Sequence, residues 1–234
     1  MNSRKIVNMF MRTLLLGAIV GFFTSFFVNW QEYSNVLRPF DGFELLGLVL
    51  FFIGLALVFT VVSLTGFFAY LFIHRFGQGF FRSFWPTVQF LFILFAIFDL
   101  IYFSYRAGKG EVSLLFYIVM TVVIIVYSII IARIKVKQTN RTAFIPTMFF
   151  MIVITALELS LVLRAADVQY IILMLTPVLA ANGYQIIALH EVAKRDEEHI
   201  KRIEARRKER LKRYEEKMKE SQAREEAKRE KKKS

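Results

Sequence analysis

The sequence predicts an all-α protein: a polytopic membrane helix bundle with six transmembrane helices, followed by a charged cytoplasmic C-terminal helix. Of the 234 residues, 56% are hydrophobic and 26 are phenylalanine, and the mean hydropathy is +0.48. This composition is too apolar for an ordinary soluble domain. Several uncharged stretches also have the length of about 20 residues that lets a helix cross a ~30 Å hydrocarbon core.

A short basic turn predicts the orientation. Arg133–Arg141 contains four basic residues and no acidic one, and it lies between the apolar stretches Val112–Ala132 and Ala143–Leu163. Because cytoplasmic loops collect lysine and arginine, this turn is predicted to be cytoplasmic. Counting the spans outward from it places both termini in the cytoplasm, in a multi-pass protein of the cell membrane.

The first two spans precede this turn. The first is predicted over Met9–Val28, where the small residues Gly17 and Gly21 would let a neighbouring helix approach closely. It is followed by the aromatic-rich Asn29–Tyr33 rather than by a small-residue cleavage site, so we interpret it as a membrane helix and not as a secretory signal. The second, Leu45–Ile73, is longer than one perpendicular crossing and is expected to tilt or to end in the interface.

Four further spans complete the membrane domain. The basic stretch His74–Arg82 is predicted to be a cytoplasmic loop that leads into the third span, Trp85–Tyr105. The fourth and fifth spans are the two apolar stretches beside the basic turn. The sixth, Tyr170–Leu189, ends a six-span membrane domain over residues 1–189.

Residues 190–234 form a charged basic tail, with 18 lysines and arginines against 12 acidic residues. Glutamates four residues before a lysine or arginine recur along it, which favours a solvated cytoplasmic helix. Its positive charge would attract anionic lipid of the inner leaflet. The alternative is a solubilising tail without a partner. Nucleic-acid binding is not expected, because only Tyr214 offers an aromatic ring for base stacking.

The candidate intramembrane polar residues are Asp99, Glu158 and Asn182. Carboxylates are costly to bury in a membrane, so Asp99 and Glu158 are functional candidates, and they lie at matching depth. If they share a polar cavity, they could form a proton or cation site of a small transporter or channel. The alternative is that nearby serine, tyrosine or arginine side chains satisfy them, or that they are protonated. Asn182 and Gln185 are expected to make interhelical hydrogen bonds.

The sequence offers no catalytic motif. It has no cysteine, which excludes disulfides, thiolate metal sites and a cysteine nucleophile. His190-Glu191 begins a zinc-protease pattern that Lys194 breaks, and neither a Walker loop nor a nucleophile elbow is present. We therefore expect no enzyme, no metal and no cofactor.

Four short strings, however, resemble a known family. They are Gly66–Tyr70 (GFFAY), His74–Gly77 (HRFG), Phe98–Phe103 (FDLIYF) and Lys137–Asn140 (KQTN), the last leading to AFIP. Over roughly residues 1–190 the chain resembles the KinB-signalling pathway activation protein family (KbaA). Its members are described as integral membrane proteins that activate a membrane sensor histidine kinase feeding the sporulation phosphorelay.

The resemblance implies a signal-transduction regulator whose partner is a membrane sensor histidine kinase; the small transporter or channel is the alternative. The tail lies outside the resemblance. The two predicted inner loops hold most of the resembling polar residues and would face the kinase's catalytic domains. The candidate partner contacts are His74, Arg75, Lys137, Gln138 and Asn140. The sequence leaves the oligomeric state and the signal open.

Overall fold

The computed structural model describes residues 3–38, 40–109, 111–164, 167–190, 207–208 and 210–211. All regular structure in these ranges is helical, as predicted, and an isolated bridge between Leu37 and Phe40 is the one β-type pairing among them. The chain divides into two compact units, residues 3–190 and residues 1–2 with 191–234. Most of the predicted tail helix lies outside the described residues.

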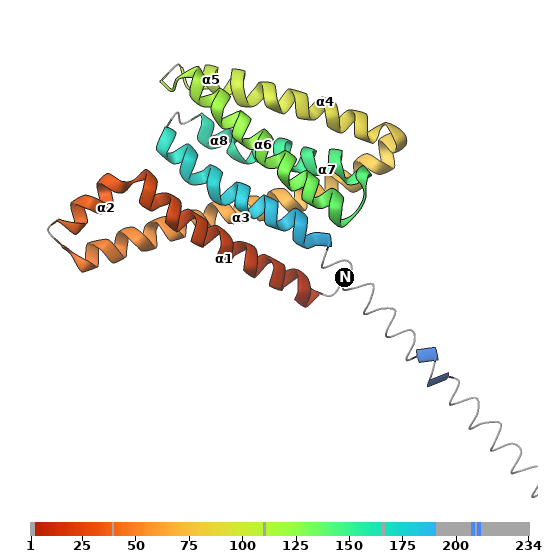
Figure 1. Ribbon diagram of the computed structural model, residues 1–234, viewed down its shortest axis with the longest axis horizontal. Coiled ribbons are helices and arrows are strands. Elements are labelled where there is room, and N and C mark those ends of the chain that lie inside the picture. Colours follow the sequence, from red (N-terminus) through yellow and green to blue (C-terminus); the bar gives the residue numbers. More distant parts are fainter. Residues whose placement is uncertain are drawn as a thin grey trace, which may run out of the picture. The chain divides into compact units, whose positions relative to one another are not determined.

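Residues 3–190 form a helical bundle (Figure 1). Its helices are α1 (Ser3–Val28), α2 (Trp30–Leu37), α3 (Gly42–Phe81), α4 (Trp85–Phe98), α5 (Ser104–Ala107), α6 (Leu114–Gln138), α7 (Phe144–Phe149) and α8 (Thr155–Leu163). The 3-10 turns Arg82–Phe84 and Arg141–Ala143 precede α4 and α7, and the π-helical turns Asp99–Phe103 and Phe150–Ile154 join α4 to α5 and α7 to α8. Val168–His190, called the last helix below, completes the bundle.

Five helical stretches in the described residues are long and apolar enough to cross a membrane. They are Lys5–Val28, Gly42–Ala107, Leu114–Gln138, Arg141–Ser160 and Val168–His190. The second, at 66 residues, joins the predicted second and third spans into one helical run. Arg82 interrupts this run with a positive φ of 49°, a conformation in which an L-residue cannot continue a right-handed helix.

Two predicted loops are shorter than expected. The prediction of a loop over His74–Arg82 is wrong, because α3 remains helical through Phe81. Likewise α6 extends through Gln138, so the basic turn is reduced to a few residues after it. Basic residues do not mark where these helices end, because lysine and arginine are good helix formers and are favourable near a helix C-terminus. The stretch between the first and second predicted spans also contains a short helix, α2.

The small pair in the first span packs as predicted. A Cβ atom added to Gly17 would overlap the Thr60 hydroxyl, and one added to Gly21 would overlap the Ala56 methyl group. Both partners belong to α3, so α1 and α3 cross closely at this pair.

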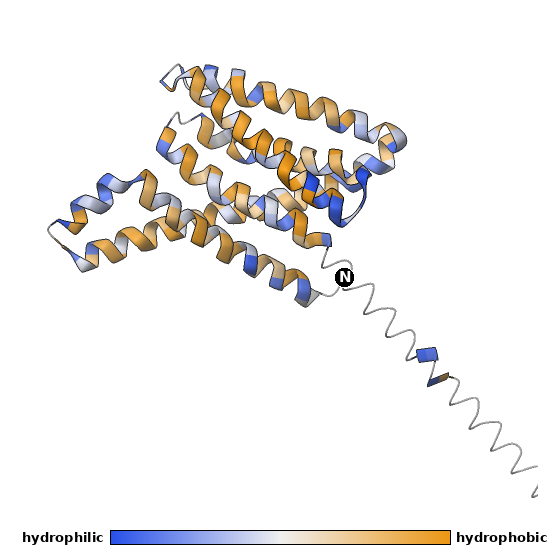
Figure 2. Cartoon of the chain, viewed as in Figure 1, coloured by the Kyte–Doolittle hydropathy of each residue, from blue (hydrophilic) through white to orange (hydrophobic). Residues whose placement is uncertain are grey.

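Acidic residues are confined to one half of the bundle, whereas basic residues occur in both halves. The start of α1, the α3–α4 turn, the α6–α7 turn and the end of the last helix lie at one end (Figure 1), and hydrophilic residues gather at the α6–α7 turn (Figure 2). We call this the basic end. Its described basic residues are Lys5, Arg12, Arg75, Arg82, Arg133, Lys135, Lys137 and Arg141. The acidic residues of 3–190 all belong to the other half: Glu32, Asp41, Glu44, Asp99, Glu111, Glu158 and Asp167.

Candidate functional site

Five polar side chains are buried together between α3, the Thr155–Leu163 helix α8 and the last helix. We call them the polar network: Ser63, Thr155, Glu158, Asn182 and Gln185, each at most 6% exposed. The Asn182 amide donates to Glu158 Oε2 over 2.7 Å and to Thr155 Oγ1 over 3.0 Å. Ser63 Oγ donates to Asn182 Oδ1 over 2.7 Å and accepts from Gln185 Nε2 over 2.9 Å. Asn182 therefore links all three helices, and the interhelical hydrogen bonds expected of Asn182 and Gln185 are present.

A glycine makes room for this network. A Cβ atom added to Gly66 of α3 would overlap Glu158 Oε1 and would lie 2.9 Å from the Ile154 side chain. Glu158 thus packs directly against the α3 backbone. Within the described residues its Oε1 atom is buried without a hydrogen-bond partner, as is Oε1 of Gln185. Gly66 begins the GFFAY string, so that string has a packing role.

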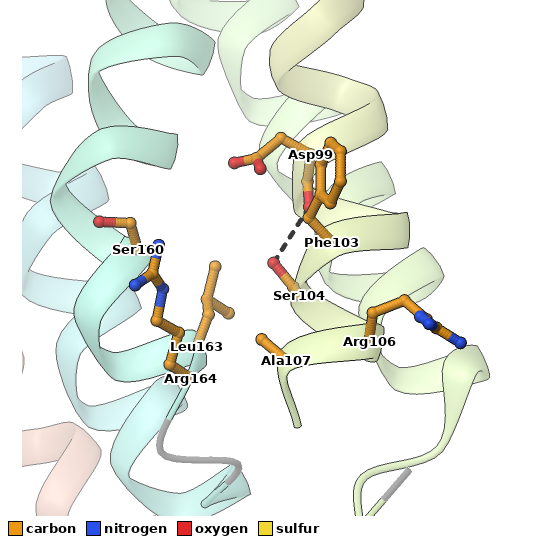
Figure 3. Close-up of a pocket in the computed structure, with 8 residues that line it drawn as sticks. All are labelled: Asp99, Phe103, Ser104, Arg106, Ala107, Ser160, Leu163 and Arg164. Carbon is orange, nitrogen blue, oxygen red and sulfur yellow. Dashed lines mark hydrogen bonds between the residues drawn. The ribbon is translucent and has the colours of Figure 1, made fainter. Parts of the chain in front are cut away.

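Asp99 lies elsewhere, in a polar cavity of about 540 Å³ between α5 and α8, at the end opposite the basic end. The cavity is lined by Asp99, Phe103, Ser104, Arg106, Ala107, Ser160, Leu163 and Arg164. Figure 3 shows the Asp99 carboxylate directed across the cavity toward the α8 wall, where Ser160 and Arg164 lie, and the Arg106 side chain directed away. Arg164 interacts electrostatically with Asp99.

The structure therefore separates the two candidate carboxylates. Glu158 is not among the residues that line the Asp99 cavity. Its hydrogen-bond partner is Asn182 of the last helix, whereas the nearby Ser160 hydroxyl donates to the Leu157 carbonyl over 2.8 Å. The Ser104 hydroxyl donates to the Asp99 backbone carbonyl over 3.1 Å and not to its carboxylate.

His74, one of the candidate partner contacts, fixes the α3–α4 turn. Its Nδ1 atom accepts a hydrogen bond from Trp85 Nε1 over 3.1 Å, and Gln89 Nε2 lies 3.4 Å from the same atom. The Trp85 ring packs over Gly77, where an added Cβ atom would overlap it. The HRFG string thus supplies both the hydrogen-bond acceptor and the gap that seat Trp85.

The other candidate contacts also lie at the basic end. Arg75, Lys137 and Asn140 are exposed, whereas Gln138 is half-buried. Another basic residue of the turn, Lys135, was not expected to be buried: its ammonium donates to the Ile186 carbonyl of the last helix. Arg75, Lys137 and Asn140 are thus the candidates most open to a partner.

Sequence reasoning missed Ser63 and Thr155. Single hydroxyl residues are common in apolar helices, where they often bond their own backbone, so neither carries a recognisable signal. The available signal was Asn182 with Gln185, which are three residues apart and therefore lie on one helix face. This pair predicts that another helix supplies a polar side chain that bonds to it, but it does not predict which residue that is.

Comparison with known proteins identifies the family of this chain. A family model described as KinB-signalling pathway activation in sporulation matches residues 17–192. The "KinB-signaling pathway activation protein" of Bacillus subtilis (strain 168) is 36% identical over 199 residues, which are 83% of this chain and all of the relative. No solved structure matches the chain. The four strings all lie within the matched region, and the chain belongs to the KbaA family, the family of KinB-signalling pathway activation in sporulation.

Proposed function

We propose that this protein carries out its family's function, activation of the KinB signalling pathway in sporulation, as a six-span membrane accessory protein that contacts a sensor histidine kinase through its basic end. This proposal rests mainly on the distribution of charged residues along the bundle of residues 3–190. All acidic residues belong to one half of the bundle, and the other half carries basic residues alone. The positive-inside rule then assigns the basic end to the cytoplasm, where a kinase's catalytic domains lie.

The length of the Gly42–Ala107 run supports six crossings. At ~1.5 Å per residue its 66 residues extend about 100 Å, some three times the ~30 Å hydrocarbon core. The reversal at Arg82 and the packing of Trp85 against His74 and Gly77 support two antiparallel crossings. With six crossings, both Ser3 and His190 belong to the cytoplasmic side.

The contact surface proposed for the kinase is formed by Arg75, Lys137 and Asn140. His74 and Gln138 would act indirectly, by holding the helix ends that carry this surface. His74 orients the α3–α4 turn, and Gln138 is half-buried at the end of α6. Activation requires that this surface bind the active kinase state more tightly than the inactive one. The basic tail would add affinity for anionic lipid at the same membrane surface.

We expect the double variant Arg75→Gln/Lys137→Gln to reduce kinase-dependent reporter output about fivefold or more, the range of a typical coupling free energy. The reason is that both exposed cations leave the proposed contact surface while the buried contacts remain. A sporulation-gene reporter measures the output, and immunoblotting measures the abundance of the protein.

The matched control is Arg106→Gln/Lys109→Gln, which removes the same charge from the opposite end. Equal output from both double variants at equal abundance would contradict the contact surface. A photo-reactive residue at Arg75, Lys137 or Asn140 tests the same surface directly: it should crosslink to a histidine kinase in membranes, and a probe at Lys109 should not.

The second candidate function, a small transporter or channel, is favoured by the presence of the carboxylates Asp99 and Glu158 within apolar helices. The variant Glu158→Gln distinguishes the transport function from kinase activation. Glutamine keeps an oxygen that can accept from Asn182, so a structural role predicts unchanged signalling and a loss of unfolding free energy below about 1 kcal/mol. Transport through Glu158 predicts that proton or cation flux in vesicles disappears in this variant.

A further inference from the structure

The polar Asp99 cavity meets an apolar groove. The groove has a volume of about 240 Å³ and lies between α4 and the segment formed by α7, the π-helical turn Phe150–Ile154 and α8. Asp99 is the residue that lines both spaces. Apart from Asp99 the groove lining is apolar or aromatic; it includes Trp85, Phe92, Phe95, Ala96, Phe149 and Leu157. A polar pocket and an apolar groove that share one residue together fit an amphiphile.

The groove is long enough for an acyl chain to cross one leaflet. Its lining extends along α4 from Asp99 to Trp85, 14 residues or about 20 Å at ~1.5 Å per residue. One leaflet occupies half of the ~30 Å hydrocarbon core, about 15 Å, so the groove lining is longer than one leaflet is thick. Asp99 lies about 12 Å below the end of α5, so the polar pocket lies near headgroup depth when the apolar helices span a bilayer.

The polar pocket presents charges of both signs. Within the described residues no group donates a hydrogen bond to the Asp99 carboxylate, which faces the cavity (Figure 3). The hydroxyl protons of Ser104 and Ser160 are used by the backbone carbonyls of Asp99 and Leu157, so their oxygens remain acceptors. These acceptors suit an ammonium group, which has three N–H donors, while the Arg164 guanidinium suits a phosphate.

We infer that this site binds an aminophospholipid, with its ammonium at Asp99, its phosphate at Arg164 and an acyl chain in the groove. Phosphatidylcholine has no N–H to donate to Asp99. Phosphatidylglycerol has no cation for it and would leave the carboxylate facing a phosphate. The site lies at the end opposite the proposed kinase surface and stands independently of that proposal.

The test is lipid retention. The full-length protein is reconstituted with equal amounts of phosphatidylethanolamine, phosphatidylcholine and phosphatidylglycerol, purified in mild detergent and analysed for bound lipid by native mass spectrometry. Phosphatidylethanolamine should be enriched. Asp99→Asn and Arg164→Gln should each lower its enrichment about tenfold, the effect of one charge-assisted hydrogen bond.

Matched variants separate binding from folding. Glu111→Gln removes an acid and Lys109→Gln a base from the same end of the bundle, and neither residue lines the cavity, so both variants should retain wild-type enrichment. Asp99→Glu keeps the carboxylate and should retain the preference. Gel filtration identifies variants that do not fold.

Three results would overturn the inference. The first is equal phosphatidylethanolamine enrichment in the wild type and in folded Asp99→Asn and Arg164→Gln. The second is preferential retention of phosphatidylglycerol. The third is displacement of the bound lipid by soluble phosphoethanolamine as effectively as by the diacyl lipid, which would show that the groove contributes nothing and that the pocket takes a free zwitterion.

Discussion

Replacing Asn182 with leucine is expected to lower the free energy of unfolding by about 3–5 kcal/mol. Leucine has a similar size but cannot donate to Glu158 or Thr155 or accept from Ser63. Three interhelical bonds at the ~0.6 kcal/mol average measured in membrane proteins give about 2 kcal/mol. Leaving a buried carboxylate without its donor adds about 1–3 kcal/mol, which gives a total of about 3–5 kcal/mol.

This loss can be measured by titrating sodium dodecyl sulfate into mixed micelles while following tryptophan fluorescence. Trp85 is 4% exposed and reports on the packing of the bundle. The control is Asn35→Leu, since Asn35 is exposed on the short helix α2. If Asn182→Leu unfolds at the same detergent fraction as wild type, the polar network does not stabilise the fold.

Gly66→Leu is the second large effect, with an expected loss of about 3 kcal/mol, the upper end for overpacking a core. Even its first carbon would overlap the Glu158 carboxyl group, so α3 and α8 must move apart or Glu158 must leave Asn182. Either response weakens the polar network. Thermal unfolding in detergent should therefore occur at a lower temperature, and less protein should accumulate in membranes.

Gly54→Leu is the matched control for this variant. Gly54 belongs to the same helix, and a Cβ atom added there would have no described atom within 4 Å. Leucine is also a better helix former than glycine by nearly 1 kcal/mol, so this variant should be as stable as wild type or slightly more stable. Similar destabilisation by both substitutions would show that any leucine on α3 is harmful and that Gly66 is not special.

Much of the fold follows from the sequence alone. The predicted first span, Met9–Val28, and the predicted sixth, Tyr170–Leu189, each lie within an observed helix, because apolar length is a local property of the chain. The basic character of the turn after α6 and the close approach at Gly17 and Gly21 were also visible as simple patterns. So was membership of the family, through strings such as HRFG and KQTN.

Helix ends near charged residues could not be predicted in this way. His74–Arg82 has the composition of a loop but is helical through Phe81, because a helix longer than a bilayer core can project into polar surroundings without breaking. What stops α3 is the backbone conformation of Arg82 together with the seating of Trp85 on His74 and Gly77. That contact joins two helices and leaves no pattern within either one.

The candidate sites were decided by tertiary structure. Asp99 and Glu158 have similar sequence surroundings, yet one lines a cavity and the other packs against Gly66 and bonds to Asn182. Lys135, expected in a basic loop, is buried against the last helix. Sequence determines which residues a helix contains, whereas the rotation of each helix about its axis determines which of them meet. That rotation is set by close packing at small residues and by shared hydrogen bonds, both of which exist only once the helices assemble.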